Sequence, residues 1–294
     1  MSQNLIDVDL AGMPAPHPMD VKGTDFPLVV AGNGEPILFV HGAWADHRIW
    51  CGLWKPISRH AKFLAYTQRH FGNWNWPDEK PYARRIHTED LINLLEVLEY
   101  PVHLAGWSYA GGILLRAAAT SPNKVLSLNI FEPSYECEPP TEKGPLKEAR
   151  EVAWKGLEPA YALAEDGDLK AGMRSGLEAV YSMSSGGFFD LHPDFQKVHL
   201  DNCHTMLPDL HAEQAKPLSA KEFAQITCPT LIMLGENSLD QYRLMAEHTG
   251  ASIDTAKLQV VDGVSHGAPV TRPDLLAEAI TQFVLNIPTG TIGD

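Results

Sequence analysis

The sequence predicts an α/β fold in which a mostly parallel sheet is covered by helices on both faces. Short apolar runs typical of buried strands alternate with helical periods up to residue 131, and the alternation resumes at Thr230. The stretch Val102–Gly112, VHLAGWSYAGG, indicates a strand, a sharp turn and a helix, with a serine at the turn. A chain of 294 residues, 44% of them apolar, can bury a full core, so we expect one domain that carries an insertion.

The first part of the chain contains the elements that this fold requires. Residues 1–20 carry prolines and acids but no apolar run, and we expect a loose leader there. Strands are predicted at residues 26–31, 36–40, 62–67, 102–105 and 125–131. Helices are predicted at residues 47–60, 88–98 and 113–119, with Thr88 as the N-cap of the second.

After residue 133 the alternation stops and later returns. Helices are predicted at residues 147–163 and 168–182, and residues 188–209 are rich in aromatics and histidine without a clear period. Strands are predicted again at residues 230–234 and 257–261, and helices from Gln241 and over residues 274–283. We therefore expect a core built from residues 21–133 and 221–294, with residues 134–220 inserted between its two parts.

The turn at Ser108 is expected to carry a nucleophile. A hydroxyl on such a turn projects away from its own backbone, and the helix that follows directs its N-terminal N–H groups toward whatever the serine attacks. Gly106 and Ala110, two residues before and after the serine, are small enough to let strand and helix pass closely. Active sites of parallel sheets gather at the carboxyl ends of the strands, where Ser108 is predicted to lie.

The motif G-x-S-x-A-G around Ser108 resembles the nucleophile elbow of the α/β-hydrolase superfamily, with alanine where glycine is common. The resemblance covers about residues 20–286 and includes a His-Gly pair at His41 and another at His266, after the last predicted strand. It implies the α/β-hydrolase fold with a mostly parallel eight-stranded sheet. It also implies that residues 134–220 form a helical cap over the pocket.

By this resemblance, His266 is the general base that activates Ser108, and a carboxylate orients it. Family members place that acid after either of two strands. The first position, used in haloalkane dehalogenases and zearalenone-type lactone hydrolases, holds Glu132 here. At the second, the usual position holds Ser238, and Asp240 follows two residues later. Glu132 is favoured because serine cannot carry the charge, and Asp240 stays an alternative that needs a shifted loop.

The resemblance also implies an oxyanion hole formed by the backbone N–H groups of Ala43 and Tyr109, with the ring of His41 holding the loop from beneath. Trp44 and Trp107 adjoin these amides and are expected to bind the substrate. The cap supplies further aromatic and apolar candidates for pocket contacts, which are Trp154, Tyr181, Phe188, Phe189 and Met206; Trp154 and Phe188 are the predicted substrate-binding residues among them.

These features predict a serine hydrolase that cleaves a carboxylic ester or lactone through an acyl-enzyme intermediate, with an apolar or aromatic acyl group. Serine at residue 108 argues against dehalogenase and epoxide hydrolase chemistry, because those family members use an aspartate there. Hydrolysis of a carbon–carbon bond and perhydrolysis use the same triad and are alternatives. A non-catalytic ligand receptor is another, because some hormone receptors reuse this fold.

No metal or cofactor is predicted. His199 and His204 are five residues apart, which does not suit a pair of metal ligands on a helix, and no HExxH motif occurs. Gly32 and Gly34 are followed by a strand, whereas a dinucleotide-binding loop must open a helix.

Composition restricts the partners and the compartment. A formal net charge of −14 argues against nucleic acids and anionic membrane surfaces, and a small-molecule ester or lactone is the expected partner. The four cysteines form no CxxC pair and indicate free thiols in a reducing compartment. No signal peptide or membrane-spanning run is visible, so we expect a cytoplasmic protein; the sequence does not predict its oligomeric state.

Overall fold

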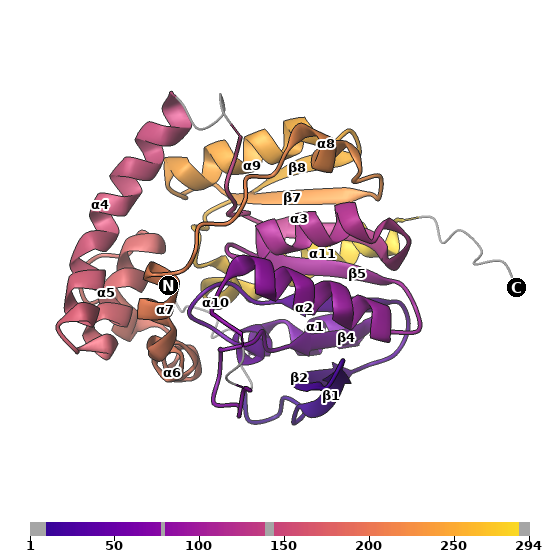
Figure 1. Ribbon diagram of the computed structural model, residues 1–294, viewed down its shortest axis with the longest axis horizontal. Coiled ribbons are helices and arrows are strands. Elements are labelled where there is room, and N and C mark those ends of the chain that lie inside the picture. Colours follow the sequence, from indigo (N-terminus) through magenta and orange to yellow (C-terminus); the bar gives the residue numbers. More distant parts are fainter. Residues whose placement is uncertain (1–9, 78–79, 139–143, 288–294) are drawn as a thin grey trace, which may run out of the picture.

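The computed structural model describes residues 10–77, 80–138 and 144–287, and an eight-stranded sheet forms its centre (Figure 1). The strands lie in the order β1-β2-β4-β3-β5-β6-β7-β8. Their bounds are β1 (His17–Val21), β2 (Thr24–Ala31), β3 (Pro36–Val40), β4 (Lys62–Tyr66), β5 (Val102–Trp107), β6 (Val125–Phe131), β7 (Thr230–Gly235) and β8 (Ala256–Val261). β2 runs antiparallel to β1 and β4, and all other neighbouring pairs are parallel, so the predicted fold class is confirmed.

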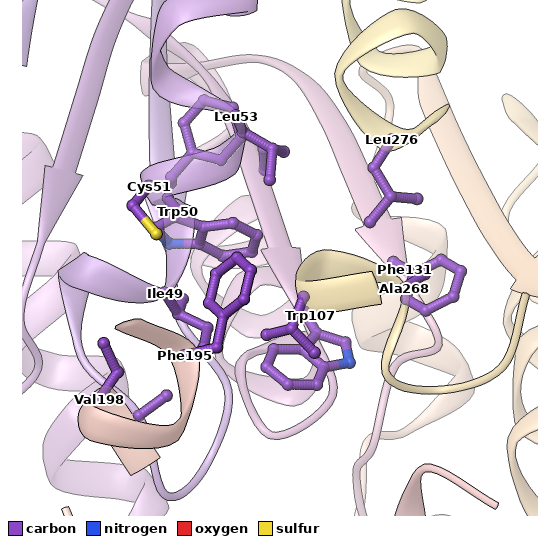
Figure 2. Close-up of a cluster of buried hydrophobic side chains, with 14 of the residues drawn as sticks. Ile49, Trp50, Cys51, Leu53, Trp107, Phe131, Phe195, Val198, Ala268 and Leu276 are labelled. Carbon is purple, nitrogen blue, oxygen red and sulfur yellow. The ribbon is translucent and has the colours of Figure 1, made fainter. Parts of the chain in front are cut away.

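The inner strands bury both faces, and a hydrophobic cluster therefore lies on each side of the sheet. In β3, Ile37 and Phe39 belong to the first cluster, whereas Leu38 and Val40 belong to the second. The first is closed by η1 (His47–Gly52), α1 (Trp54–Ser58) and α11 (Pro273–Leu285), and Figure 2 shows part of it. The second is closed by α2 (Arg84–Val97), α3 (Ala110–Thr120) and α9 (Asp240–Ser252). Shorter helices are η2 (Pro122–Lys124), α8 (Ala220–Ala224) and α10 (Ala268–Thr271).

The prediction of a loose leader over residues 1–20 is wrong at its end. β1 is an edge strand that pairs with β2, with His17 opposite Leu28 and Val21 opposite Thr24. Within β1 only Val21 is buried, so the strand lacks the apolar alternation by which half-buried strands are recognised. Residues 1–9 lie outside the described residues.

Two predicted helices have different bounds in the structure. The helix predicted from Thr88 begins at Arg84, with Ala83 as its N-cap. Thr88 lies inside α2, where its Oγ1 donates a hydrogen bond to the carbonyl oxygen of Arg84 at 2.8 Å. A threonine bonded in this way fits a helix interior, so residue type alone misplaced the start. Residues 47–60, predicted as one helix, are divided at Leu53 into η1 and α1.

The inserted segment forms a layer of helices at one end of the sheet, on the left of Figure 1. Its elements are α4 (Pro145–Glu165), α5 (Leu169–Val180), η3 (Gly187–Asp190), α6 (Pro193–Asp201), η4 (Cys203–Thr205) and α7 (Met206–Leu210). The first two agree with the predicted helices to within two residues. The stretch without a clear period, residues 188–209, folds as the four short helices that follow. Among the described residues, no helix is long and apolar enough to cross a membrane.

Candidate active site

Ser108 stands at the sharp turn between β5 and α3. Its φ angle is 55°, a left-handed conformation that costs energy for a residue with a Cβ atom. The turn also brings strand and helix very close. A Cβ atom added to Gly106 would lie 2.5 Å from Leu114 Cδ1 and 3.3 Å from Ala110 Cβ. Gly106 therefore has no room for a side chain, and Ala110 lies against it, in agreement with the small residues expected on both sides of Ser108.

His266 follows β8 and brings its imidazole between Ser108 and Glu132. Its Nε2 lies 2.9 Å from Ser108 Oγ, and its Nδ1 lies 2.6 Å from Glu132 Oε2. Because a carboxylate can only accept, Nδ1 carries the proton and donates it, while Nε2 offers a lone pair to the serine hydroxyl. Both Glu132 and His266 are buried. The arrangement can remove the hydroxyl proton from Ser108 and make its oxygen a nucleophile.

Of the two carboxylates that the sequence leaves open, the structure brings Glu132 to the histidine. Its other oxygen, Oε1, accepts hydrogen bonds from the backbone N–H of Gly235 at 2.7 Å and from the hydroxyl of Ser238. Asp240 has 73% of its side chain exposed and pairs with Arg243 at 2.9 Å. Ser238 thus supports the carboxylate from the position at which the resemblance usually places the acid itself.

Tyr242 of α9 makes a contact with the histidine that the sequence did not reveal. Its ring lies parallel to the imidazole of His266, with 3.6 Å between the centroids and 5° between the planes. An aromatic face in this position restricts rotation of the imidazole and favours the positive charge that the ring acquires when it takes a proton. Burial raises the pKa of Tyr242, so its hydroxyl stays protonated. No motif marks this residue, and only folding brings α9 against the histidine.

The loop after β3 provides the second wall of the site. Ala43 and Tyr109 line the cavity at the serine, and within the described part of the chain their backbone N–H groups have no hydrogen-bond partner. Two such donors are what an oxyanion hole requires. Beneath them, His41 Nε2 accepts a hydrogen bond from the backbone N–H of Gln68 at 3.0 Å. Its Nδ1 donates to the carbonyl oxygen of Gly42 at 2.8 Å, so His41 holds the loop as predicted.

The same loop is held from the other side by His199 of α6. His199 Nδ1 donates to the carbonyl oxygen of Trp44 at 2.9 Å, and its Nε2 accepts from the hydroxyl of Tyr181 at 3.1 Å. Trp44 has a φ angle of 58°, so this bond fixes a strained residue directly after Ala43. Burial lowers the pKa of His41 and of His199 to about 4, and both rings are neutral at neutral pH.

Acid is expected to destabilise the protein through these two histidines. The unfolded chain takes up their protons near the ordinary pKa of 6.5 and the folded protein only near 4, so the unfolded state binds more protons between these values. The free energy of unfolding should therefore fall as the pH drops through this window, by up to about 1.4 kcal/mol per pH unit for each ring.

Denaturant titrations at about pH 6 and about pH 5 measure this slope. His199→Gln keeps a donor for the carbonyl of Trp44 but cannot take up the proton. The free energy of unfolding of this variant should therefore change less steeply with pH, by the contribution of one histidine. A slope equal to that of the wild type would show that His199 is not buried in the neutral form.

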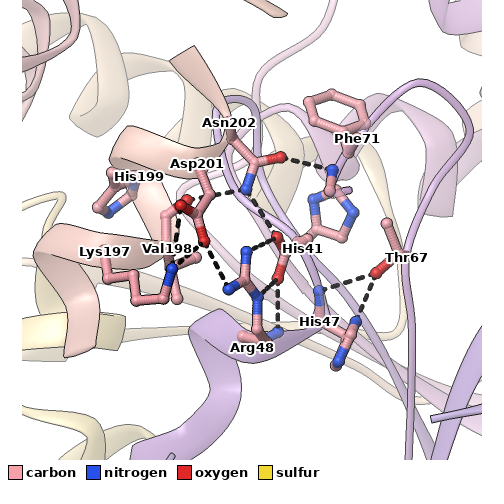
Figure 3. Close-up of polar contacts among 12 residues, drawn as sticks. His41, His47, Arg48, Thr67, Phe71, Lys197, Val198, His199, Asp201 and Asn202 are labelled. Atoms are coloured by element: carbon pink, nitrogen blue, oxygen red, sulfur yellow. Dashed lines mark hydrogen bonds and ion pairs between the residues drawn. The ribbon is translucent and has the colours of Figure 1, made fainter. Parts of the chain in front are cut away.

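Hydrogen bonds between charged and polar side chains join the loop to the end of α6, and Figure 3 shows Arg48 of η1 beside Asp201 and Asn202. Asp46 accepts hydrogen bonds from Arg48 Nη2 and from Asn202 Nδ2, each at 2.7 Å. Burial opposes its ionisation, but the hydrogen bonds and positive charge of Arg48 outweigh that effect and lower the pKa of Asp46 to about 2. Arg48 continues to Asp201 of α6, with 2.8 Å between Nη1 and Oδ2. The core and α6 are thus joined by a hydrogen-bonded chain of charges.

The cavity at Ser108 has a volume of about 210 Å³. Of the residues predicted to contact the substrate, those that line it are Trp44, Trp107 and Tyr181, and those outside it are Trp154, Phe188, Phe189 and Met206. The prediction of Trp154 and Phe188 as binding residues is therefore corrected. Trp154 is 44% exposed and stacks on the ring of Tyr161, whereas Phe188 has no exposed surface and packs in the first hydrophobic cluster.

The cavity also has a polar wall that the sequence did not indicate. Arg84, the first residue of α2, lies 4.6 Å above the ring of Tyr109, and its buried Nε and Nη1 make no hydrogen bond within the described residues. Asp209 of α7 accepts a hydrogen bond from the hydroxyl of Tyr82 at 3.2 Å, and burial raises its pKa. Neither Arg84 nor Asp209 belongs to a motif, and their elements meet only in the folded chain. No three potential metal ligands come together in the parts of the chain that the structure describes.

The chain is similar in sequence to a known esterase. It is 25% identical over 167 residues to the pimeloyl-[acyl-carrier protein] methyl ester esterase of Pseudoalteromonas atlantica. This match covers 57% of the chain and 59% of the relative, so the chain spans about three fifths of the length of that protein.

Solved structures share its fold over almost the whole chain. An alpha/beta hydrolase from Sphaerobacter thermophilus matches with a TM-score of 0.69 and 22% identity, covering 91% of this chain and 100% of the other. Carboxylesterase CesB from Bacillus subtilis matches with a TM-score of 0.73 and 16% identity, covering 94% of each chain. The model of the alpha/beta hydrolase family matches residues 37–279, which include the serine, the glutamate and the histidine described above. The chain belongs to the alpha/beta hydrolase family.

Proposed function

We propose that this protein is a serine hydrolase that cleaves a carboxylic ester or lactone through an acyl-enzyme intermediate. The observation that carries the proposal is the continuous contact from Ser108 Oγ through His266 to the buried carboxylate of Glu132, at 2.9 and 2.6 Å. Support also comes from the similar proteins, which include a methyl ester esterase and a carboxylesterase.

In the proposed reaction, His266 Nε2 takes the hydroxyl proton as Ser108 Oγ attacks the carbonyl carbon. The negative charge that forms on the carbonyl oxygen meets the backbone N–H groups of Ala43 and Tyr109, which are fixed before the reaction begins. Glu132 stabilises the imidazolium and keeps its orientation. The imidazolium then gives its proton to the leaving alkoxide, and the acyl group stays on Ser108. Water, activated by the same histidine, releases the acid and restores the serine.

Apart from the polar wall with Arg84 and Asp209, the cavity is lined mainly by apolar and aromatic side chains, which favour an apolar or aromatic group next to the scissile carbonyl. Trp44 and Trp107 lie on the side of the proposed oxyanion hole, and Leu157 and Leu177 line the cavity from the cap. Burial of an apolar group against these side chains makes the free energy of binding more favourable, because it removes the group from water. A charged group here would lose its hydration. A panel of esters should therefore show higher kcat/KM for aryl or medium-chain acyl groups than for charged ones.

A fluorophosphonate probe tests the proposal directly. The serine oxygen of an active triad displaces fluoride and forms a stable bond to phosphorus, so the wild-type protein should be labelled with one equivalent per chain. Ser108→Ala removes the attacking oxygen and should abolish both labelling and ester hydrolysis, with a loss in kcat of about 10³-fold or more. A wild-type protein that takes up no probe and hydrolyses no ester would instead support the ligand-receptor alternative.

A further inference from the structure

A groove runs between the cap helix α4 and the core helix α9. Its volume is about 500 Å³, more than twice the 210 Å³ of the cavity at the serine. Most of its wall is apolar, with Ala149, Val152, Ala153 and Gly156 on α4, and Leu239 and Leu244 on the opposite side. Val152 is 70% exposed, although its side chain is apolar. A concave surface lined mainly by apolar side chains is typical of small-molecule binding sites.

The groove adjoins the cavity that contains Ser108. Leu157, Val180 and Gln241 line both spaces, so only these side chains stand between a ligand at the serine and the space between α4 and α9. The cavity alone is smaller than the roughly 300 to 1,000 Å³ of typical small-molecule sites. The groove supplies the missing volume, and it does so with apolar side chains.

We propose that this groove binds an extended apolar chain of the ester substrate. The proposal rests on the hydrolase function inferred above and adds a substrate class to it: esters that carry an unbranched chain longer than the cavity can hold. The three residues shared with the cavity favour part of the substrate as the occupant, because a separate partner would not need a groove directly beside Ser108. Glu148, Asp240 and Arg243 stand among the groove residues as charged groups, so the apolar part of the groove is limited in length.

A series of p-nitrophenyl esters of increasing acyl length and a series of alkyl acetates test the proposal. For one of the two series, kcat/KM should rise by roughly fourfold for each methylene beyond those that fill the cavity, which corresponds to the about 0.8 kcal/mol of a buried methylene. The series that rises identifies whether the acyl or the alcohol side occupies the groove. A flat response in both series would overturn the proposal while leaving ester hydrolysis itself established.

Gly156 offers a selective block of the groove. A Cβ atom added there meets nothing within 4 Å, so a larger side chain enters open space and does not disturb packing. Gly156→Phe should lower kcat/KM by about tenfold or more for the long member of the series that rises, p-nitrophenyl decanoate or decyl acetate, which corresponds to the loss of roughly two buried methylenes. It should leave the short esters, p-nitrophenyl acetate and methyl acetate, unchanged. Gly156→Ala is the matched control for the loss of glycine. Lys155→Phe adds the same bulk to an exposed neighbour that does not line the groove.

A second variant and a binding measurement test the groove independently of Gly156→Phe. Val152→Asp places a charge in the groove at an exposed position and should reduce activity on long chains only. Equal losses on short and long chains in both variants would contradict the proposal. Calorimetric titration of Ser108→Ala with methyl octanoate and methyl acetate examines the groove without catalysis. Tighter binding of the octanoate, weakened by Gly156→Phe, is expected, and equal binding of the two esters would overturn it even if the protein hydrolysed no ester.

Discussion

Replacement of Glu132 by glutamine is expected to lower kcat by about 10³- to 10⁴-fold with little change in the fold. The amide has nearly the same shape and can still accept from Gly235 and Ser238, so the loop should keep its position. The amide N–H, however, would donate to His266 Nδ1 and move the imidazole proton to Nε2. That tautomer cannot take the proton of Ser108, and the positive charge on the ring would lose its partner.

Asp240→Asn is the matched control, because it removes the other carboxylate that the sequence offered. Asp240 pairs with Arg243 at the surface and does not contact the histidine, so kcat should not change measurably. Steady-state kinetics on p-nitrophenyl acetate, whose acyl group is too short to occupy the groove beside Asp240, compares the two variants, with circular dichroism to verify folding. A larger loss for Asp240→Asn than for Glu132→Gln would move the acid to the loop after β7.

Replacement of Asp46 by alanine is expected to lower the free energy of unfolding by about 3 kcal/mol or more. The carboxylate is 1% exposed and neutralises Arg48, while it also accepts a hydrogen bond from Asn202. Removing it leaves the guanidinium, which is four fifths buried, with Asp201 as its remaining carboxylate, and takes one of the two acceptors from the buried amide of Asn202. The loss in the free energy of unfolding is larger than the net stabilisation of one hydrogen bond, because the remaining polar groups stay buried and cannot bond to water instead.

Asp201→Ala tests the outer end of the same chain of charges. Asp201 is as exposed as Arg48, but its removal leaves Arg48 paired with Asp46, so the free energy of unfolding should fall by only about 1 to 2 kcal/mol. Guanidinium unfolding of both variants at neutral pH gives the comparison. If both substitutions lowered the free energy of unfolding by the same amount, the burial of Asp46 would not make it more important than Asp201 for joining the core to α6.

The inner strands were predictable because burial on two sides leaves a continuous apolar run between turn residues. The predicted bounds of β3 and β6, residues 36–40 and 125–131, agree with the structure. β1 was not predictable in this way, since an edge strand with one buried residue has almost no pattern. Thr88 shows a related limit: its hydroxyl can cap a helix or bond inside one, and neighbouring sequence does not distinguish the two uses.

Residues of the candidate site were predictable where a local turn demands a residue type. Ser108 lies in a turn that admits only small neighbours, and His266 follows the last strand in a short loop. Tyr242 and Arg84 reach the site from helices whose relative placement depends on the whole core. An apolar residue of the cap such as Phe188 can be buried in the hydrophobic core or can line the cavity, and the sequence alone does not distinguish the two positions.

The hydrogen bonds between the end of α6 and the loop after β3 fix the inserted helices and the core relative to one another on this side of the cavity. His199 holds the carbonyl of Trp44, and Asn202 holds the carboxylate of Asp46. A graft that exchanged the cap for that of a relative would remove both anchors at once and loosen the residue beside the proposed oxyanion donor. Recombinants that aim at new selectivity would therefore have to keep this face of α6, or redesign the loop together with it.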